Sequence, residues 1–586
     1  MNPVNLAIDR LGRAGRPART QPTVLELDLS HGVRSAPPPS PLAALRQRRT
    51  PSMRSIRDGL RKAAADPKVL GLLVHVGACP LTLAEADEIG GLIARFSKVR
   101  PSIAWTESFG ELSSGLAGYR VAINAREIWL QPSGALGLTG VHLGITLLRG
   151  GLEKLGLDPQ FSQRHEYKSA ADQLAATEIT EANREMIQRI ADSLLADTTA
   201  RVAQRRGLDH AAVTSAIERA PLPAPAALEA GLIDRIGYRD EVYAWTRENW
   251  PAPSAGQDEG EGAPRFALRY AHRYGKQSVS DQVERVVRRN RPRIAVVDVI
   301  GPIIVGAGRP GGGGQAPSDA VTARLRAAGR DPHVKAVLLH VDSPGGSYIA
   351  SDAIRREVLQ LRDSGRPVVA AMGTVAASGG YYVSMGADEI VCQPSTLTGS
   401  IGVLAGKLVT ERLLDRMGVV HASIDAGPQA AMMASGAPFT EHQWRVLNSW
   451  LDEVYADFTG KAATDRGLAL AEMEALARGR VWTGVDAAAH RLVDHLGGMD
   501  LATDRACALA GVDRDEVQLV SGPPLPFLAG LHPDESSEST GGTQIDLPFG
   551  NPWSGGPDAL LAAFADWAGL AVPHGVLSLP YRMTVT

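Results

Sequence analysis

The sequence predicts an α/β fold made by tandem duplication of a single unit, and internal repeats are the first reason. Residues 66–76 read DPKVLGLLVHV and residues 331–341 read DPHVKAVLLHV, at an offset of 265. Two more pairs of segments repeat in the same order at nearly the same offset, namely 131–141 with 393–403 and 230–237 with 490–497. Because order and spacing are kept, the chain contains two copies of a unit of about 220 residues.

The second reason is the alternation of strands and helices within each copy. The runs LLVHV (72–76) and VLLHV (337–341) are continuously apolar, which is typical of strands buried on both faces. Helical patterns follow them at 84–96 and 351–363, so each copy is expected to hold a parallel or mixed sheet. The sequence predicts a disordered N-terminal segment, a first domain, a Pro/Gly/acidic linker, a second domain and a tail, at 1–20, 21–250, 251–290, 291–515 and 516–586.

Composition and charge exclude several classes of protein. The net charge is −3 and the pI is about 6.6, so we expect no general attraction to nucleic acid. Three cysteines, without a second Cys or a His at metal-ligand spacing, predict neither a disulfide framework nor a metal site. We interpret them as small buried side chains: Cys79, Cys392 and Cys507.

The sequence shows no targeting or membrane-spanning segment. The arginine-rich N-terminus is not followed by the apolar stretch of a secretory signal, and no run of 18 apolar residues occurs. These features predict a cytoplasmic protein or one peripheral to a membrane. The glycine-rich stretch 308–315 lacks the Gly-Lys-Ser/Thr ending of a phosphate loop and is expected to be a plain loop. The apolar stretch 557–570 is expected to be a docking helix, with contact to a membrane surface as the alternative.

The second copy carries a serine in a chemically suggestive place. The apolar run 368–372 reads as a strand, and a short helix is expected after Ser378-Gly379-Gly380. A serine at such a turn lies at a helix N-terminus, where backbone N–H groups can stabilise a developing oxyanion. Upstream, Gly345 and Gly346 follow another predicted strand and can present N–H groups to the same point. SPGG alone would be an ordinary turn, but both loops together indicate an oxyanion hole.

The first copy differs from the second at these positions. At an offset of 262, Leu116 stands where the second copy has Ser378, and ACPL (78–81) replaces the glycine loop. Conversely, the first copy carries Lys168, which aligns near Ala430. One half therefore has a serine and the other a lysine, as expected if one active site is divided between them.

Four short motifs resemble those of the protease IV (signal peptide peptidase A) family in its long, tandem form. They are EYKSA at 166–170, DSPGGS at 342–347, ASGGYY at 377–382 and TGSIGV at 398–403. The resemblance covers roughly residues 24–510. It implies that each unit has a Clp protease/crotonase-like β-spiral with flanking helices. The first domain would supply the lysine base and the second the serine nucleophile.

The resemblance also implies roles for single residues. Ser378 matches the nucleophile, Lys168 the general base, and Ser400 a serine that orients the lysine amine. Gly345 and Gly379 match the oxyanion donors. The implied enzyme is a serine endopeptidase that needs no cofactor or metal and hydrolyses hydrophobic peptides, including cleaved signal peptides. It would form a tetramer-like homo-oligomer. Long members begin with a membrane span that this sequence lacks, so only peripheral membrane association is expected.

Elementary chemistry restricts how such a dyad works. A free lysine has a pKa near 10.4 and is charged at pH 7, so it serves as a base only where burial lowers that pKa. We therefore expect Lys168 to be desolvated and Glu166 to point away from it.

Three alternatives would account for part of the same pattern. His340 with Asp342 could form a Ser–His–Asp triad, but His75 occupies the same place in the copy without a nucleophile, which favours a structural role. A crotonase-like acyl-CoA enzyme would share the glycine loops but would use a catalytic carboxylate. A non-catalytic membrane-stress scaffold would keep the fold without needing both Ser378 and Lys168.

Overall fold

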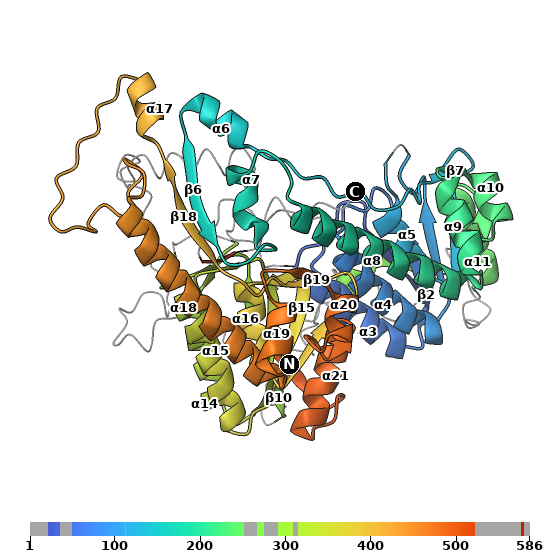
Figure 1. The fold of residues 1–586 in the computed structure, drawn as a ribbon. Coiled ribbons are helices and arrows are strands. Elements are labelled where there is room, and N and C mark those ends of the chain that lie inside the picture. Colours follow the sequence, from blue (N-terminus) through green and yellow to red (C-terminus); the bar gives the residue numbers. More distant parts are fainter. Residues whose placement is uncertain are drawn as a thin grey trace, which may run out of the picture.

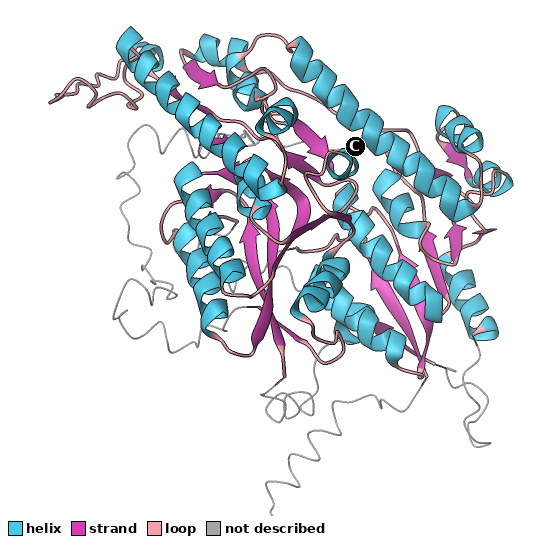
Figure 2. Cartoon of the chain, turned by 60° about the horizontal axis from the view of Figure 1, so that its bottom comes forward, coloured by secondary structure: helices cyan, strands magenta, loops and turns pink. Residues whose placement is uncertain are grey.

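The computed structural model describes residues 22–35, 50–111, 113–250, 266–274, 291–308, 314–521 and 576–578. It contains two main β-sheets, each flanked by helices (Figures 1 and 2). We call residues 22–274 the N-terminal half and residues 291–578 the C-terminal half. The predicted α/β fold in two repeated units is confirmed. The segments 1–20 and 557–570 lie outside the described residues, as does most of the glycine-rich loop.

The sheet of the N-terminal half has six strands, all paired in parallel, in the order β8-β4-β3-β2-β1-β9. Its strands are β1 (Thr23–Asp28), β2 (Val69–His75), β3 (Ser102–Thr106), β4 (Glu127–Leu130), β8 (Arg235–Ile236) and β9 (Ala267–Tyr270); β5 (Ala135–Leu136) pairs with β7 (Leu222–Pro223), and β6 is Asp158–Gln163. The helices are α3 (Met53–Ala65), α4 (Leu83–Val99), α5 (Leu116–Ala122), α6 (Arg149–Leu155), η1 (Ser169–Ala171), α7 (Asp172–Ala175), α8 (Glu181–Arg206), α9 (His210–Glu218), α10 (Ala224–Glu229), α11 (Arg239–Asn249) and α12 (Ala271–Tyr274).

The C-terminal half repeats this plan with additions. Its main sheet follows the path β19-β17-β15-β13-β10-β21, with β16 and β20 joined at β15. The strands are β10 (Arg293–Ile300), β13 (Val334–Ser343), β15 (Val368–Ala377), β16 (Glu389–Cys392), β17 (Leu397–Gly399), β19 (Val481–Thr483), β20 (His495–Leu496) and β21 (Gln518–Ser521). A small sheet joins β11 (Ile303–Ile304), β12 (Ala316–Pro317), β14 (Gly345–Gly346) and β22 (Leu577–Ser578). The helices are α14 (Ser318–Arg330), α15 (Tyr348–Asp363), α16 (Gly379–Met385), α17 (Glu411–Arg416), α18 (Glu441–Arg466), α19 (Leu470–Leu476), α20 (Gly484–Ala489) and α21 (Met499–Ala510); β18 is Leu404–Val409.

Segments that read as linker and tail supply equivalent edge strands. Within the predicted linker 251–290, strand β9 pairs in parallel with β1. Within the predicted tail 516–586, strand β21 pairs in parallel with β10. Each sheet therefore extends by one strand beyond the boundary that composition suggested.

The longest helices, α8 and α18, show how the two halves repeat at atomic level. Each has 26 residues and begins at a threonine cap, Thr180 or Thr440, whose side chain accepts a backbone N–H. Each ends at a glycine with positive φ, Gly207 or Gly467, where a side chain would be strained. The same sequence signals therefore set the same helix in both halves.

The two halves are interlocked by a strand pair. Strand β6 of the N-terminal half pairs antiparallel with β18 of the C-terminal half, and the two lie side by side in Figure 1. Arg164, just after β6, continues the contact by donating its backbone N–H to the carbonyl of Val403. This pairing carries the chain that follows β6 into the C-terminal half.

Buried side chains behind both sheets fix the framework. Tyr119 and Tyr381 are fully buried and donate their hydroxyls to the carbonyls of Leu232 and Leu492. All three cysteines are buried and unpaired, as expected. Within the described part of the chain, no helix combines the length and apolar character that crossing a bilayer requires.

Candidate active site

Ser378 lies between strand β15 and helix α16, at the strand-to-helix turn that the sequence predicts. Its backbone has φ 55° and ψ −114°, a conformation that is costly for a residue with a side chain. The backbone N–H of Ser378 donates to the carbonyl of Gly399 at 2.8 Å, which holds the turn. The hydroxyl makes no helix-capping hydrogen bond, so it is directed to other partners.

Lys168 reaches this serine from the other half of the chain. It follows β6, and its side chain is fully buried. Its Nζ lies 2.7 Å from the Ser378 Oγ, 3.0 Å from the Ser400 Oγ and 3.0 Å from the Ser400 carbonyl oxygen. A single chain thus brings together the predicted nucleophile, the predicted base and the predicted orienting serine.

These three contacts match the hydrogen-bonding capacity of a neutral amine. A neutral lysine has two N–H donors and one lone pair. The two donors can serve the carbonyl and hydroxyl oxygens of Ser400, while the lone pair accepts the hydroxyl proton of Ser378. The geometry therefore suits a lysine that withdraws a proton from serine.

Burial also lowers the pKa of Lys168 well below its ordinary value, because a charged ammonium loses its hydration there. Among the described residues no carboxylate forms an ion pair with Lys168. Glu166 instead pairs with Arg478 at 2.9 Å on the surface. Desolvation therefore favours the neutral form of the Lys168 amine, and no ion pair with a described carboxylate opposes it.

The glycine loop lies against the serine turn. A β-carbon built on Gly345 would stand 2.7 Å from the amide nitrogen of Gly379, so the two predicted oxyanion donors are close neighbours. The amide of Gly345 donates to the Ser343 Oγ at 3.2 Å, a long bond that an oxyanion would have to share or replace. Gly345 has φ +101°, which favours glycine at this position.

Two more glycines place the lysine, and the sequence motifs did not reveal them. A β-carbon on Gly479 would stand 2.5 Å from the backbone nitrogen and Cα of Lys168, and one on Gly402 would stand 3.3 Å from its Cδ. The Lys168 backbone can therefore approach Gly479 only because that position lacks a side chain, and Gly402 leaves room for the lysine side chain. Gly402 lies in the TGSIGV motif, but Gly479 has no motif of its own.

The corresponding place in the N-terminal half is filled by apolar side chains. Leu116 and Leu138, at the positions of Ser378 and Ser400, are both buried in the core. In the copy without the serine, the same turn therefore contributes apolar side chains to the core.

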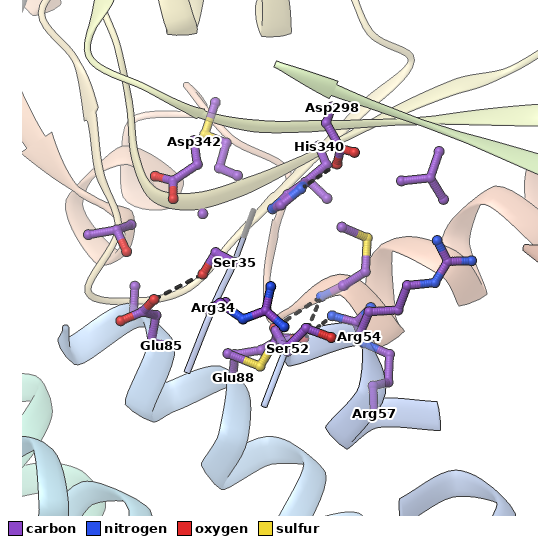
Figure 3. A pocket seen from close by; sticks show the side chains of 18 of the residues that line it. Arg34, Ser35, Ser52, Arg54, Arg57, Glu85, Glu88, Asp298, His340 and Asp342 are labelled. Atoms are coloured by element: carbon purple, nitrogen blue, oxygen red, sulfur yellow. Dashed lines mark hydrogen bonds and ion pairs between the residues drawn. The ribbon is translucent and has the colours of Figure 1, made fainter. Parts of the chain in front are cut away.

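The histidines form pairs away from the dyad. His340 Nδ1 lies 2.9 Å from Asp298, and His75 of the other half lies 3.2 Å from the equivalent Asp28. His340 and Asp298 face a cavity of about 460 Å³ between the two halves, which Asp342 also lines (Figure 3). Asp342 accepts the backbone N–H of Val375 rather than a histidine proton. A triad of Ser378, His340 and Asp342 is therefore not assembled.

Comparisons with known proteins identify the family of this chain. The family model described as "Peptidase family S49" matches residues 94–250 and 360–513, once in each half. The chain is 31% identical over 465 residues to "Serine protease SPPA, chloroplastic" of Arabidopsis thaliana, covering 78% of this chain and 65% of that protein. It is 30% identical over 467 residues to "Protease 4" of Salmonella typhi, covering 78% of this chain and 72% of the relative.

Among solved structures, a membrane-bound stomatin-specific protease shares 13% identity over 40% of this chain and 99% of its own, with a TM-score of 0.26. A similarity this low adds nothing to the assignment. The family match and the relatives place the protein in the class of serine peptidases. More particularly, the chain belongs to peptidase family S49. The expected resemblance to the protease IV family is confirmed.

Proposed function

We propose that this protein is a serine endopeptidase with a Ser378–Lys168 dyad divided between its two halves. The observation that carries the proposal is the 2.7 Å contact between the Lys168 Nζ and the Ser378 Oγ, fully buried and without a carboxylate partner in the described chain. A serine hydroxyl becomes nucleophilic only when a neighbour takes its proton, and burial lowers the pKa of this lysine in the direction that such a role requires.

The geometry supports the following sequence of steps. Ser378 attacks the scissile carbonyl carbon while Lys168 takes the hydroxyl proton and then gives it to the leaving amine. The amides of Gly345 and Gly379 stabilise the oxyanion. Water then attacks the acyl-enzyme, with Lys168 again taking a proton, and the acid product leaves. Ser400 keeps the amine aimed at Ser378 throughout.

Hydrophobic peptides, including cleaved signal peptides, are the proposed substrates. The names of the relatives support peptide hydrolysis, and the end of β15 next to Ser378 is made of the small, buried residues Ala376 and Ala377. Neither acyl-CoA chemistry nor a purely structural role explains a desolvated lysine against a serine. Location in the cytoplasm or at a membrane surface stays a prediction.

A head-to-tail oligomer is the proposed assembly, and the repeat supports it. Strand β6 pairs with β18 across the halves. At an offset of 262, the counterpart of β6 is 420–425 and that of β18 is 142–147, and neither segment forms a named strand. Val420 is 92% exposed, and the segment after α17 runs out from the body in Figure 1. A second copy could pair 420–425 with 142–147 as β6 pairs with β18. A clean monomer in sedimentation would contradict this assembly.

Hydrolysis of a fluorogenic hydrophobic peptide tests the proposed activity. Wild type should cleave it, and Ser378→Ala should fall to background. The matched control is Ser384→Ala, because Ser384 is also buried on α16 but its hydroxyl donates to the Gly380 carbonyl. Wild type that stays inert on a broad peptide panel would contradict the peptidase.

A further inference from the structure

The last described part of the chain, residues 576–578, returns to the glycine loop as strand β22. It pairs antiparallel with β14, where Leu577 lies opposite Gly346. On the other side, the backbone N–H of Leu404 donates to the carbonyl of Val576 at 3.0 Å. The segment is therefore held through its backbone between the glycine loop and the beginning of β18.

The position of Leu577 is that of a substrate residue. A β-carbon built on Gly345 would stand 2.1 Å from the Leu577 carbonyl oxygen and 2.7 Å from the Gly379 amide nitrogen. The carbonyl thus lies beside the proposed oxyanion donors. The Leu577 side chain is fully buried among the apolar residues of the C-terminal half. A carbonyl at the oxyanion loop and an apolar side chain in a pocket are what a peptide substrate would present next to Ser378.

We propose that residues 576–578 occupy the substrate channel of Ser378 and compete with substrate from within the chain. Substrates bind in the same way, as an extended strand between β14 and β18, with an apolar side chain where Leu577 now lies. Addition of a strand to an exposed edge gives affinity through the backbone and selectivity through alternate side chains. This inference rests on the proposed function: it adds how the peptide substrate binds and which segment of the chain competes with it.

Competition from within has a defined consequence. When the binding-competent state is populated only in part, the apparent affinity for an added ligand falls by that fraction. An added peptide must displace the segment, so its apparent affinity should improve when the segment is loosened. If 576–578 only covered a strand edge away from substrate, loosening it would leave peptide affinity unchanged.

A binding experiment on inactive full-length protein separates this inference from the catalytic proposal. The probe is a fluorescein-labelled peptide with the sequence of residues 572–582, followed by anisotropy on Ser378→Ala. Adding Leu577→Asp should tighten apparent binding at least about tenfold, because a charged side chain opposes burial. Adding Leu577→Met, which conserves volume, should leave binding close to that of Ser378→Ala. Equal affinity in all three, or no binding in any, would overturn the inference.

A measurement without a new variant guards against misfolding of Leu577→Asp. Hydrogen exchange of the Ser378→Ala chain should show protection at residues 576–578, and saturating peptide should remove it. Exchange that stays unchanged while the peptide binds would also overturn the inference. In active protein, Leu577→Asp should lower KM for a fluorogenic peptide at unchanged kcat, since it removes a competitor and leaves the dyad intact. Unchanged KM would contradict the competition.

Discussion

The two halves share a framework but differ in what they offer at the same turn. Both bury a tyrosine against a backbone carbonyl, and both hold an arginine–aspartate pair, Arg206 with Asp234 and Arg466 with Asp494. Only the C-terminal half has a serine at the turn, whereas the N-terminal half fills it with Leu116. The comparison teaches that packing residues define the repeat, and that the chemistry lies where the two copies differ.

The lysine shows the reverse difference. After β6 the chain enters the other half, where Lys168 is fully buried beside Ser378. In the C-terminal copy the equivalent residues, 420–425 and Ala430, are exposed. Burial lowers the pKa of Lys168, as its proposed role as a base requires, whereas the equivalent position of the other copy has neither the amine nor the buried setting.

The largest effect should come from replacing this lysine. Lys168→Ala should lower kcat for a fluorogenic peptide about 10³- to 10⁴-fold or more, because a general base is lost. Lys168→Arg should not rescue it, since a guanidinium stays charged. The matched control is Lys407→Met: Lys407 is also buried, with its pKa lowered by burial, but it donates to the carbonyls of Met432 and Ala434. If Lys168→Ala keeps most of its activity, the base is elsewhere.

The glycine loop should give the next largest effect. Gly345→Ala should lower kcat by about 10²- to 10³-fold, because the new β-carbon would meet the Gly379 amide 2.7 Å away and disturb an oxyanion donor. Gly365→Ala is the control: Gly365 also has positive φ, at +77°, but has no neighbour within 4 Å. It should cost about 1 kcal/mol of stability and little activity. Equal losses in both variants would mean that backbone strain, not the oxyanion loop, explains the result.

A smaller effect is expected at Ser400. Ser400→Ala removes one of two oxygen partners of the Lys168 amine and leaves the carbonyl in place. Loss of one hydrogen bond of about 1 kcal/mol corresponds to a kcat that is roughly fivefold lower, with KM unchanged. Ser400→Thr, which keeps a hydroxyl, should recover part of the rate. A full wild-type rate in Ser400→Ala would remove the orienting role.

The smallest effect is expected at Glu166. Although it lies two residues from Lys168, it forms an exposed ion pair with Arg478. Exposed pairs contribute at most about 1 kcal/mol, which corresponds to about fivefold in rate, so Glu166→Gln should change kcat by less than that. A large gain in rate at neutral pH would mean that this carboxylate does act on the lysine.

The repeat and the motifs predicted the α/β fold in two units and the residues that meet at the dyad. Both have strong signatures in sequence, because apolar runs reveal buried strands and Ser378 lies in a glycine-rich turn. The domain boundaries were less readable. Strands β9 and β21 are short and lie in polar or Pro/Gly-rich surroundings, so composition suggested a linker and a tail.

Contacts between distant segments could not be predicted. Strands β6 and β18 pair although they lie more than two hundred residues apart in the sequence. No repeated sequence motif marks either strand. Gly479 matters only because the Lys168 backbone approaches it, which no local pattern shows. Strand β22 lies far beyond the motifs, and its buried Leu577 was not distinguished from the surrounding tail.

The central claim is that buried, neutral Lys168 activates Ser378 within one chain, and serine labelling tests it most directly. A fluorophosphonate probe, with the modified residue mapped by mass spectrometry, should label Ser378 in wild type and not in Lys168→Ala. Because burial lowers the pKa of Lys168, the labelling rate should stay high as pH falls below the ordinary lysine pKa, and should drop only when pH passes through that lowered pKa. Labelling of Lys168→Ala at the wild-type rate, or labelling that begins only near pH 10, would contradict the account.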